Sequence, residues 1–275
     1  QLRHPNHPVP RLVATAPNQV WSWDITKLIG PVKWTCYYLY VLLDIYSRYV
    51  VGWMVARLES GSLARWLIQE SCRKQAVVPG ELTLHADRGP SMVSKPVALL
   101  LADLGLTKSH SRPHVSNDNP YSEAQFKTLK YRPAFPDRFG GLEHARSFCN
   151  EFFTYYNTQH RHSGLGMLTP ESVQYGYAED ILAAREKTLK RAYLTHPERF
   201  VQGPPQIQGL PSEVWINPPR ISDKSQHDPQ VCHTPGDTTP NPIPISVREA
   251  KMPIPPPLEA GGNFTKLSHS VSQSC

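Results

Sequence analysis

Three acidic side chains stand at positions where a carboxylate is costly or exposed to a ligand. Asp24 lies inside an expected strand with the sequence WSWDIT, whose aromatic neighbours make a desolvated carboxylate costly unless a cation meets it. Asp87 directly follows the expected buried strand 82–86, and Glu123 lies in the first turn of an expected helix that Pro120 opens. Carboxylate oxygens are the ligands that Mg²⁺ and Mn²⁺ prefer, so the three together predict a divalent-metal site.

Each of these carboxylates also has an ordinary structural explanation. An Asp in a strand often belongs to a turn or an edge, an Asp after a strand often caps a helix, and a first-turn Glu complements the helix dipole. Taken singly, these explanations outweigh a function, whereas the joint pattern favours the metal site. Three further residues are expected to be purely structural: Asp44 in a hairpin turn, Asp103 at a helix end and Asp118 at a capping position.

The elements that must position these side chains follow from the hydrophobic pattern. Aromatic and β-branched runs predict three antiparallel strands, after which shorter strands alternate with helices, as in an α/β fold with a mixed sheet. The expected strands are 19–28, 37–43, 49–55, 82–86 and 106–109, and the expected helices are 62–74, 95–104, 122–130, 141–158, 170–176 and 178–194.

The charge balance favours an anionic partner. The 275 residues carry 29 Lys and Arg against 23 Asp and Glu, a net charge of +6. Residues 220–275 hold five basic and five acidic side chains, so the whole excess lies in residues 1–219. The longest apolar run, 34–43, is roughly half of the about 20 residues that a membrane helix needs, so no membrane partner is expected.

The cysteines, the opening residues and the prolines indicate which metal or disulfide sites, which compartment and which domain boundaries to expect. Five widely spaced cysteines without a Cys-x-x-Cys pair argue against a zinc ribbon or a disulfide framework and favour a reducing compartment. The opening residues lack the apolar stretch of a secretory signal, so we expect no export. Fourteen of the 28 prolines fall between positions 204 and 257. We therefore expect a linker at 1–18, a folded core at 19–160, a helical C-terminal extension at 161–219 and a Pro-rich disordered tail at 220–275.

Long segments of the chain resemble a known family, the Asp-Asp-Glu transposases of bacterial insertion sequences and the related retroviral-type integrases. The segments are NQVWSWDIT, YYLYVLLDIYSRYVVGW, LTLHADRG, SHSRPHVSNDNPYSEAQFKTLKYR and FTYYNTQHRHSGLGMLTPESV. The resemblance covers about residues 18–175 and implies that 19–160 is an integrase-type catalytic core with a ribonuclease-H-like fold, a five-stranded mixed sheet flanked by helices.

The resemblance also implies the chemistry. The family places its metal-binding carboxylates at Asp24, Asp87 and Glu123, and its spacing of 35 residues between the second and third is reproduced here. Two Mg²⁺ or Mn²⁺ ions at these residues imply cleavage of a DNA strand by water and then attack of the freed 3′-hydroxyl on a second DNA. The expected partners are DNA ends, target DNA and further copies of the chain on DNA, in the bacterial cytoplasm at the nucleoid.

Two lysines on the helix of Glu123 are candidate DNA contacts. Lys127 and Lys130 follow Glu123 by four and seven residues and fall within about 40° of it around the helix. The alternative is an ordinary Glu–Lys pair on a solvated face. Because the related integrases use the matching positions to hold DNA phosphates, we expect the same of both lysines.

Three further residues are weaker candidates for DNA binding. His85 precedes Asp87 by two residues and so shares its side of the strand, although a packed histidine is an equal alternative. Arg112 lies in the loop before Glu123, which resembles the active-site loop of integrases. Arg161 belongs to a segment of the resemblance whose role we take to be mostly structural.

Three functions remain open. The first is an active DNA strand transferase. The second is a catalytically idle DNA-binding fragment, because related transposases carry a helix-turn-helix before the core and residues 1–18 hold none. The third is a general nuclease on the same fold. Joining of one DNA to another separates the first from the other two, and metal-dependent nicking separates the third from the second.

Overall fold

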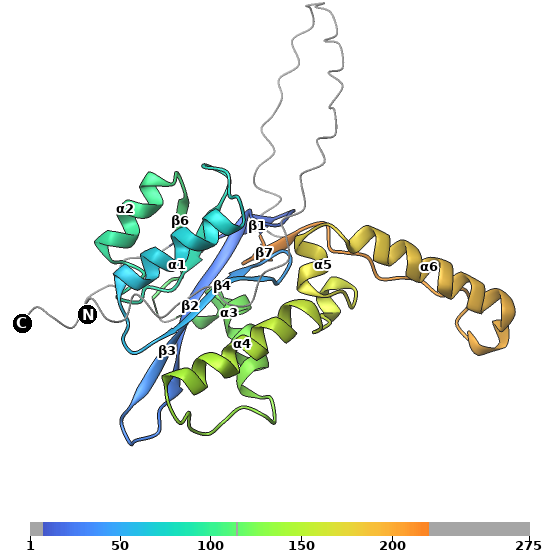
Figure 1. Ribbon diagram of the computed structural model, residues 1–275. Coiled ribbons are helices and arrows are strands. Elements are labelled where there is room, and N and C mark those ends of the chain that lie inside the picture. Colours follow the sequence, from blue (N-terminus) through green and yellow to red (C-terminus); the bar gives the residue numbers. More distant parts are fainter. Residues whose placement is uncertain (1–7, 114, 220–275) are drawn as a thin grey trace, which may run out of the picture. The chain divides into compact units, whose positions relative to one another are not determined.

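The computed structural model describes residues 8–113 and 115–219, which contain a five-stranded sheet with helices on both faces (Figure 1). The sheet strands are β2 (Val20–Ile29), β3 (Cys36–Asp44), β4 (Val50–Ala56), β5 (Thr83–Ala86) and β6 (Thr107–His110). The helices are α1 (Gly61–Lys74), α2 (Lys95–Asp103), α3 (Pro120–Lys130), α4 (Leu142–Thr158), α5 (Pro170–Gln174) and α6 (Ala178–Thr195). Short 3-10 turns lie at η1 (Ser116–Asp118), η2 (Ser163–Leu165) and η3 (Pro197–Arg199).

The sheet is mixed, with the order β4-β3-β2-β5-β6. β2, β3 and β4 pair antiparallel because short hairpin loops connect them, whereas β5 and β6 run parallel to β2 because each follows a helical crossover. The longest strand, β2, therefore lies at the centre and separates an antiparallel half from a parallel half. This confirms the expected α/β fold class.

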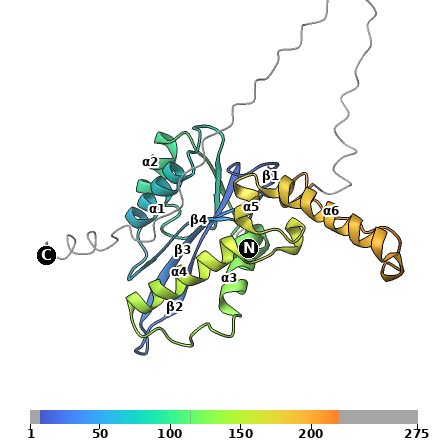
Figure 2. The ribbon, with the colours of Figure 1, turned by 45° about the vertical axis from the view of Figure 1, so that its right-hand side comes forward.

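Alternate residues of β2 face two different hydrophobic cores. Trp21 and Trp23 point into the core shared with α1 and α2, whereas Leu28 points into the core shared with α3 and α4. Figure 2 shows the two helix pairs on opposite faces of the sheet. Asp24, an even-numbered residue like Leu28, therefore belongs to the α3 and α4 face.

A small second sheet joins distant parts of the chain. β1 (Leu12–Ala14) pairs antiparallel with β7 (Val214–Ile216), and both strands pack with Val20 and Ile45. The sequence pattern predicts no strand in either segment, because three residues give no period to recognise and the pairing spans about 200 positions. The predicted division into a linker, core, extension and tail stays a prediction, and the tail at 220–275 lies outside the described residues.

Several helix ends follow the expected chemistry. Ser60 caps α1 by accepting a hydrogen bond from the Ser62 N–H at 3.2 Å, and Thr169 caps α5 by accepting one from the Ser172 N–H at 3.3 Å. α3 begins at Pro120, two residues before the predicted start. Proline at the first helical position lacks only an N–H that would be unpaired there, so the earlier start carries no cost.

Candidate active site

The register of the parallel strands brings the two aspartates together. The last paired residues of β2 and β5 are Trp23 and Ala86, and Asp24 and Asp87 each follow one position later. Neighbouring strands lie about 4.8 Å apart, so the two carboxylates leave the sheet side by side on the same face. The carboxyl end of β5 is thus the place where the predicted site is built.

Hydrogen bonds tie the start of α3 to the same point of β2. The Ser22 hydroxyl donates to Asn119 Oδ1 and shares a second hydrogen bond with the Ser122 hydroxyl. Asn119 Nδ2 donates to the backbone carbonyl of Trp23 at 3.4 Å. Because Ser122 is fastened to the residue two positions before Asp24, the following residue, Glu123, is placed beside the two aspartates.

The electrostatics of Asp24 show that the three carboxylates form one group. Burial, followed by the negative charges of Asp87 and Glu123, raises the pKa of Asp24 to about 7. A hydrogen bond from the Ile25 N–H at 2.7 Å and the charge of Lys130 act in the opposite direction without cancelling the shift. The structure therefore gathers the predicted triad, and its negative charge is only partly compensated by the protein.

The three carboxylates are not arranged around a single position where one metal ion could bind all of them. Asp24 Oδ1 accepts from its neighbour's N–H, and Asp87 Oδ1 accepts from the Ser111 hydroxyl at 2.6 Å. Over residues 8–113 and 115–219, no three His, Cys, Asp or Glu side chains are arranged so that they could hold a metal ion. The donor type suits a hard divalent cation, because carboxylate oxygens are its preferred ligands and the charges of Asp87 and Glu123 both reach Asp24.

The two predicted lysines differ in what they contact. Lys130 donates to the Thr26 hydroxyl at 2.6 Å, across from β2, and its charge reaches Asp24. Burial lowers the pKa of the Lys130 ammonium, and the charge of Asp24 partly restores it. Lys127 is exposed, one turn closer to Glu123 on α3. Both remain predicted DNA contacts, and Lys130 is the one that lies against the carboxylates.

The prediction that His85 contacts DNA is wrong, because this side chain is fully buried. Its ring hydrogen-bonds the Ser109 hydroxyl through Nδ1 at 3.0 Å and the backbone carbonyl of Asp118 through Nε2 at 2.8 Å. Burial lowers the pKa of the imidazole and so favours its neutral form. His85 is instead the packed histidine of the alternative interpretation, joining β5 to β6 and to the turn before α3.

Arg112 is held by Asp118 in a bidentate ion pair. Its Nε and Nη2 donate to the two carboxylate oxygens at 2.9 and 3.0 Å. Although burial acts to raise the pKa of Asp118, the hydrogen bonds from Arg112 and Asn217 lower it to about 2. Asp118 therefore braces the loop, while Asn119 occupies the capping position of α3. Arg161 is exposed and donates to the Met167 carbonyl at 3.2 Å. A DNA contact by either arginine stays a prediction.

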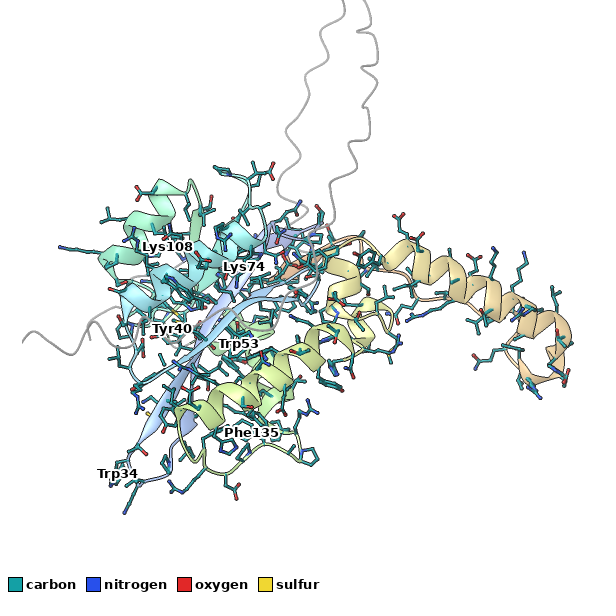
Figure 3. The ribbon with its side chains drawn as sticks, viewed as in Figure 1. Trp34, Tyr40, Trp53, Lys74, Lys108 and Phe135 are labelled. Carbon is teal, nitrogen blue, oxygen red and sulfur yellow. The ribbon has the colours of Figure 1, made fainter. Side chains whose placement is uncertain are left out.

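A cavity of about 320 Å³ opens at the outer edge of β6, against the segment Pro8–Pro10. Its basic lining consists of Arg88, Lys108, His110 and Arg112 (Lys108 is labelled in Figure 3). Burial lowers the pKa of the Lys108 ammonium, which is the effect expected of a cation without an acidic partner. The edge of the sheet beside Asp87 is thus suited to negative charge.

Sequence reasoning missed the residues that position the triad. Ser22, Ser111, Asn119 and Ser122 are buried and hold Asp87 and the start of α3. One signal was present: Ser22 is a polar residue at the same parity as Asp24, between the aromatic residues Trp21 and Trp23. The others lie in loops or at a helix start, where serine and asparagine are common.

The strand order, with a long central strand between an antiparallel and a parallel half and helices on both faces, defines the ribonuclease-H-like fold. Residues 14–116 and 104–170 match two families that are both described as Integrase core domain. Residues 14–170 therefore match integrase core domains, and the curated relatives that this part of the chain is similar to include transposases of bacterial insertion sequences.

Individual relatives agree with this assignment. The transposase for insertion sequence element IS904 of Lactococcus lactis is 34% identical over 162 residues, which are 58% of this chain and 63% of the relative. Transposase InsF for IS3A of Escherichia coli is 31% identical over 162 residues, 58% of this chain and 55% of the relative. The matched region thus spans less than two thirds of either relative.

Among solved structures, the integrase catalytic core domain of HTLV-2 in complex with magnesium is similar with a TM-score of 0.44 and 16% identity, covering 58% of this chain and 97% of that one. Within the part of the chain that the structure describes, no helix is long and apolar enough to cross a membrane.

Proposed function

We propose that this chain is the catalytic core of a DNA transposase, which cleaves a DNA strand and transfers its end to a second DNA. The observation that carries this proposal is that the register of the parallel strands places Asp24 beside Asp87 and that the charges of Asp87 and Glu123 both act on Asp24. The family of the domain supports the same reaction.

The three carboxylates would hold two divalent ions, Mg²⁺ or Mn²⁺. When bound, such ions stabilise the negative charge that develops on the attacking and leaving oxygens of a phosphodiester. In this proposal the carboxylates act as metal ligands, and a bound cation would oppose the rise in the Asp24 pKa that burial and the charges of Asp87 and Glu123 cause. Asp24 Oδ1 accepts a hydrogen bond from the Ile25 N–H, which leaves lone pairs of the carboxylate for an ion.

The surrounding residues would hold the DNA and the ligands in place. Lys130, and next to it Lys127, face the negative phosphodiester, and Arg88 and Lys108 line the basic cavity at the edge of β6. Ser111 orients Asp87. Arg161 and Arg112 are secondary candidates for phosphate contacts. We further propose that copies of the chain assemble on DNA and that it acts in the bacterial cytoplasm at the nucleoid.

A strand-transfer assay tests the proposal. Labelled duplexes with the sequences that flank the gene are incubated with the chain and Mg²⁺ or Mn²⁺, and joined products are separated by size. Glu123→Gln is expected to lose joining by more than about 100-fold, beyond the effect typical of residues that only orient metal ligands. The matched control is Glu151→Gln, an exposed glutamate of α4, which should join like the wild type.

The other outcomes separate the alternatives. Nicking of any duplex without joining would identify a general nuclease. Binding of DNA without nicking or joining under either metal would identify an idle fragment. Either result overturns the proposed strand transfer.

A further inference from the structure

The tip of the hairpin between β2 and β3 exposes an aromatic residue that the proposed site does not use. Trp34 is 91% exposed, more than any other aromatic side chain in the described part of the chain. Figure 3 shows it at the free end of the hairpin. Its neighbours Ile29 and Val32 are exposed as well. Exposing the apolar surface of an indole to water costs free energy, and exposed apolar patches mark interaction sites. The exposed group of Trp34, Val32 and Ile29 therefore points to a ligand.

The backbone at Trp34 is strained in a way that presents this side chain. Its φ is +70°, in the left-handed region that bulky residues rarely adopt. Such strain persists where the surroundings fix it, and it occurs most often at functional sites.

The hairpin tip is braced by hydrogen bonds from both of its sides. The Gly30 N–H donates to the Thr35 carbonyl at 2.9 Å, and the Thr35 hydroxyl donates to the Val32 carbonyl at 2.6 Å. A side chain at position 30 would collide with this hydroxyl, which explains the glycine. Outside the turn, Arg138 Nη1 donates to the Gly30 carbonyl at 3.2 Å. These contacts make the tip a rigid platform.

The charge of the hairpin selects the kind of partner. Residues 25–43 contain two lysines and no acidic residue. Lys33 lies over the Trp34 ring at 5.2 Å, and Lys27 is exposed on β2. A second copy of this chain would bring the same positive charge to the tip, whereas a nucleic acid brings phosphates to the lysines and bases to the indole.

The hairpin continues the strand that carries Asp24. Five residues separate Asp24 from Ile29, the end of β2, which is about 17 Å at 3.3 Å per residue. A DNA strand rises about 3.4 Å per nucleotide, so a strand held at the carboxylates reaches the end of β2, where the turn that carries Trp34 begins, after about five nucleotides. Lys130, which donates to the Thr26 hydroxyl on the same face of β2 as Asp24, lies along this path.

We propose that the β2–β3 hairpin is a second DNA-contact element, in which the Trp34 indole stacks on an unpaired base about five nucleotides from the phosphodiester at the carboxylates. This inference rests on the proposed function for the distance, whereas the stacking itself needs only DNA binding. Lys33 adds a phosphate contact beside the stacked base.

Equilibrium binding to labelled DNA tests the inference with the full 275-residue chain. The probes are a duplex with a single-stranded extension of five nucleotides and the same duplex fully paired. Trp34→Ala is expected to weaken binding to the extended duplex about tenfold, and Trp34→Phe to retain most of the affinity, because any aromatic face can stack. The matched control is Leu194→Ala, an exposed apolar residue on α6.

A fluorescent base locates the contact. With 2-aminopurine at each position of the extension in turn, the wild type should quench the emission most strongly near the fifth position, and Trp34→Ala should remove that quenching. Equal binding of wild type and Trp34→Ala to both probes overturns the inference. So does a change of oligomeric mass in Trp34→Ala at unchanged DNA affinity, which would assign the tip to an interface between copies.

The failure of this inference and the failure of the proposed function can be told apart. Glu123→Gln should join no DNA and still lose affinity when Trp34→Ala is added. If the wild type joins no DNA while Trp34→Ala still weakens DNA binding, the proposed strand transfer is wrong and the proposed hairpin contact is supported. If joining succeeds and Trp34→Ala binds like the wild type, only the hairpin contact falls.

Discussion

Asp24 and Asp44 are two acidic residues on neighbouring strands, and their surroundings differ in one respect. Asp44 is fully buried and accepts four hydrogen bonds, from the N–H groups of Asn18, Tyr46 and Ser47 and from the Ser47 hydroxyl, at 2.7 to 3.0 Å. Asp24 accepts a hydrogen bond from the N–H of its neighbour Ile25, and the negative charges of Asp87 and Glu123 act on it.

The difference separates a structural carboxylate from a ligand. Burial raises the pKa of both groups, but the donors around Asp44 oppose the shift and use its oxygens. Asp44 therefore has no oxygen left for an outside ligand and serves the hairpin between β3 and β4, as the sequence predicted. Asp24 retains capacity for a cation, and its negative neighbours make a cation favourable.

The largest effect expected from this comparison is on activity. Asp24→Asn removes a charged ligand from the triad and should reduce strand joining by more than about 100-fold. Joined products are measured in the assay used for Glu123, with circular dichroism to verify folding. If Asp24→Asn joins DNA as well as the wild type, Asp24 is not a metal ligand and does not differ in function from Asp44.

The same substitution at Asp44 should act on stability. Asp44→Asn replaces the oxygen that accepts from the Asn18 N–H by an NH₂ group, so two donors face each other in a buried place. We expect a loss of about 2–3 kcal/mol in the free energy of unfolding, measured by urea denaturation, because an unsatisfied buried donor costs that much. No loss of stability would show that the hairpin does not depend on the charge of Asp44.

The smallest effect is a gain of stability in Asp24→Asn that depends on pH. The pKa of Asp24 in the folded state, about 7, lies above the ordinary value of 3.8, so the unfolded chain releases this proton first as pH rises. The folded state is therefore penalised progressively between about pH 4 and 7 and fully above pH 7. A shift of about three pKa units at 1.36 kcal/mol per unit corresponds to about 4 kcal/mol. Because solvent screens this partly exposed group, we expect about half of that penalty, or about 2 kcal/mol.

Thermal unfolding at a series of pH values measures this gain. Asp24→Asn should unfold at a higher temperature than the wild type at pH 8 and at the same temperature at pH 4. Saturating Mg²⁺ at pH 8 should raise the melting temperature of the wild type and narrow the difference, because a bound cation removes the same repulsion. An equal gain at pH 4 and pH 8 would contradict the assignment of the penalty to ionised Asp24.

The sequence predicted the candidate metal ligands better than the residues that position them. WSWDIT, the strand before Asp87 and the proline before Glu123 were enough to select three carboxylates, because strand periods and helix starts are local properties. The same reasoning could not choose between a DNA contact and a packed ring for His85. That choice depends on Ser109 and the Asp118 carbonyl, which lie 24 and 33 positions away.

The sequence by itself determined the order of the strands and helices, the acidic triad and the family resemblance. Only the tertiary structure decided which polar residues are buried beneath the triad, that Arg112 is held by Asp118, and that β1 pairs with β7. It also decided that Trp34 stands free on a strained turn. The reason is physical: local patterns fix the conformation of a segment, whereas burial and partners depend on the register and crossovers that bring distant segments together.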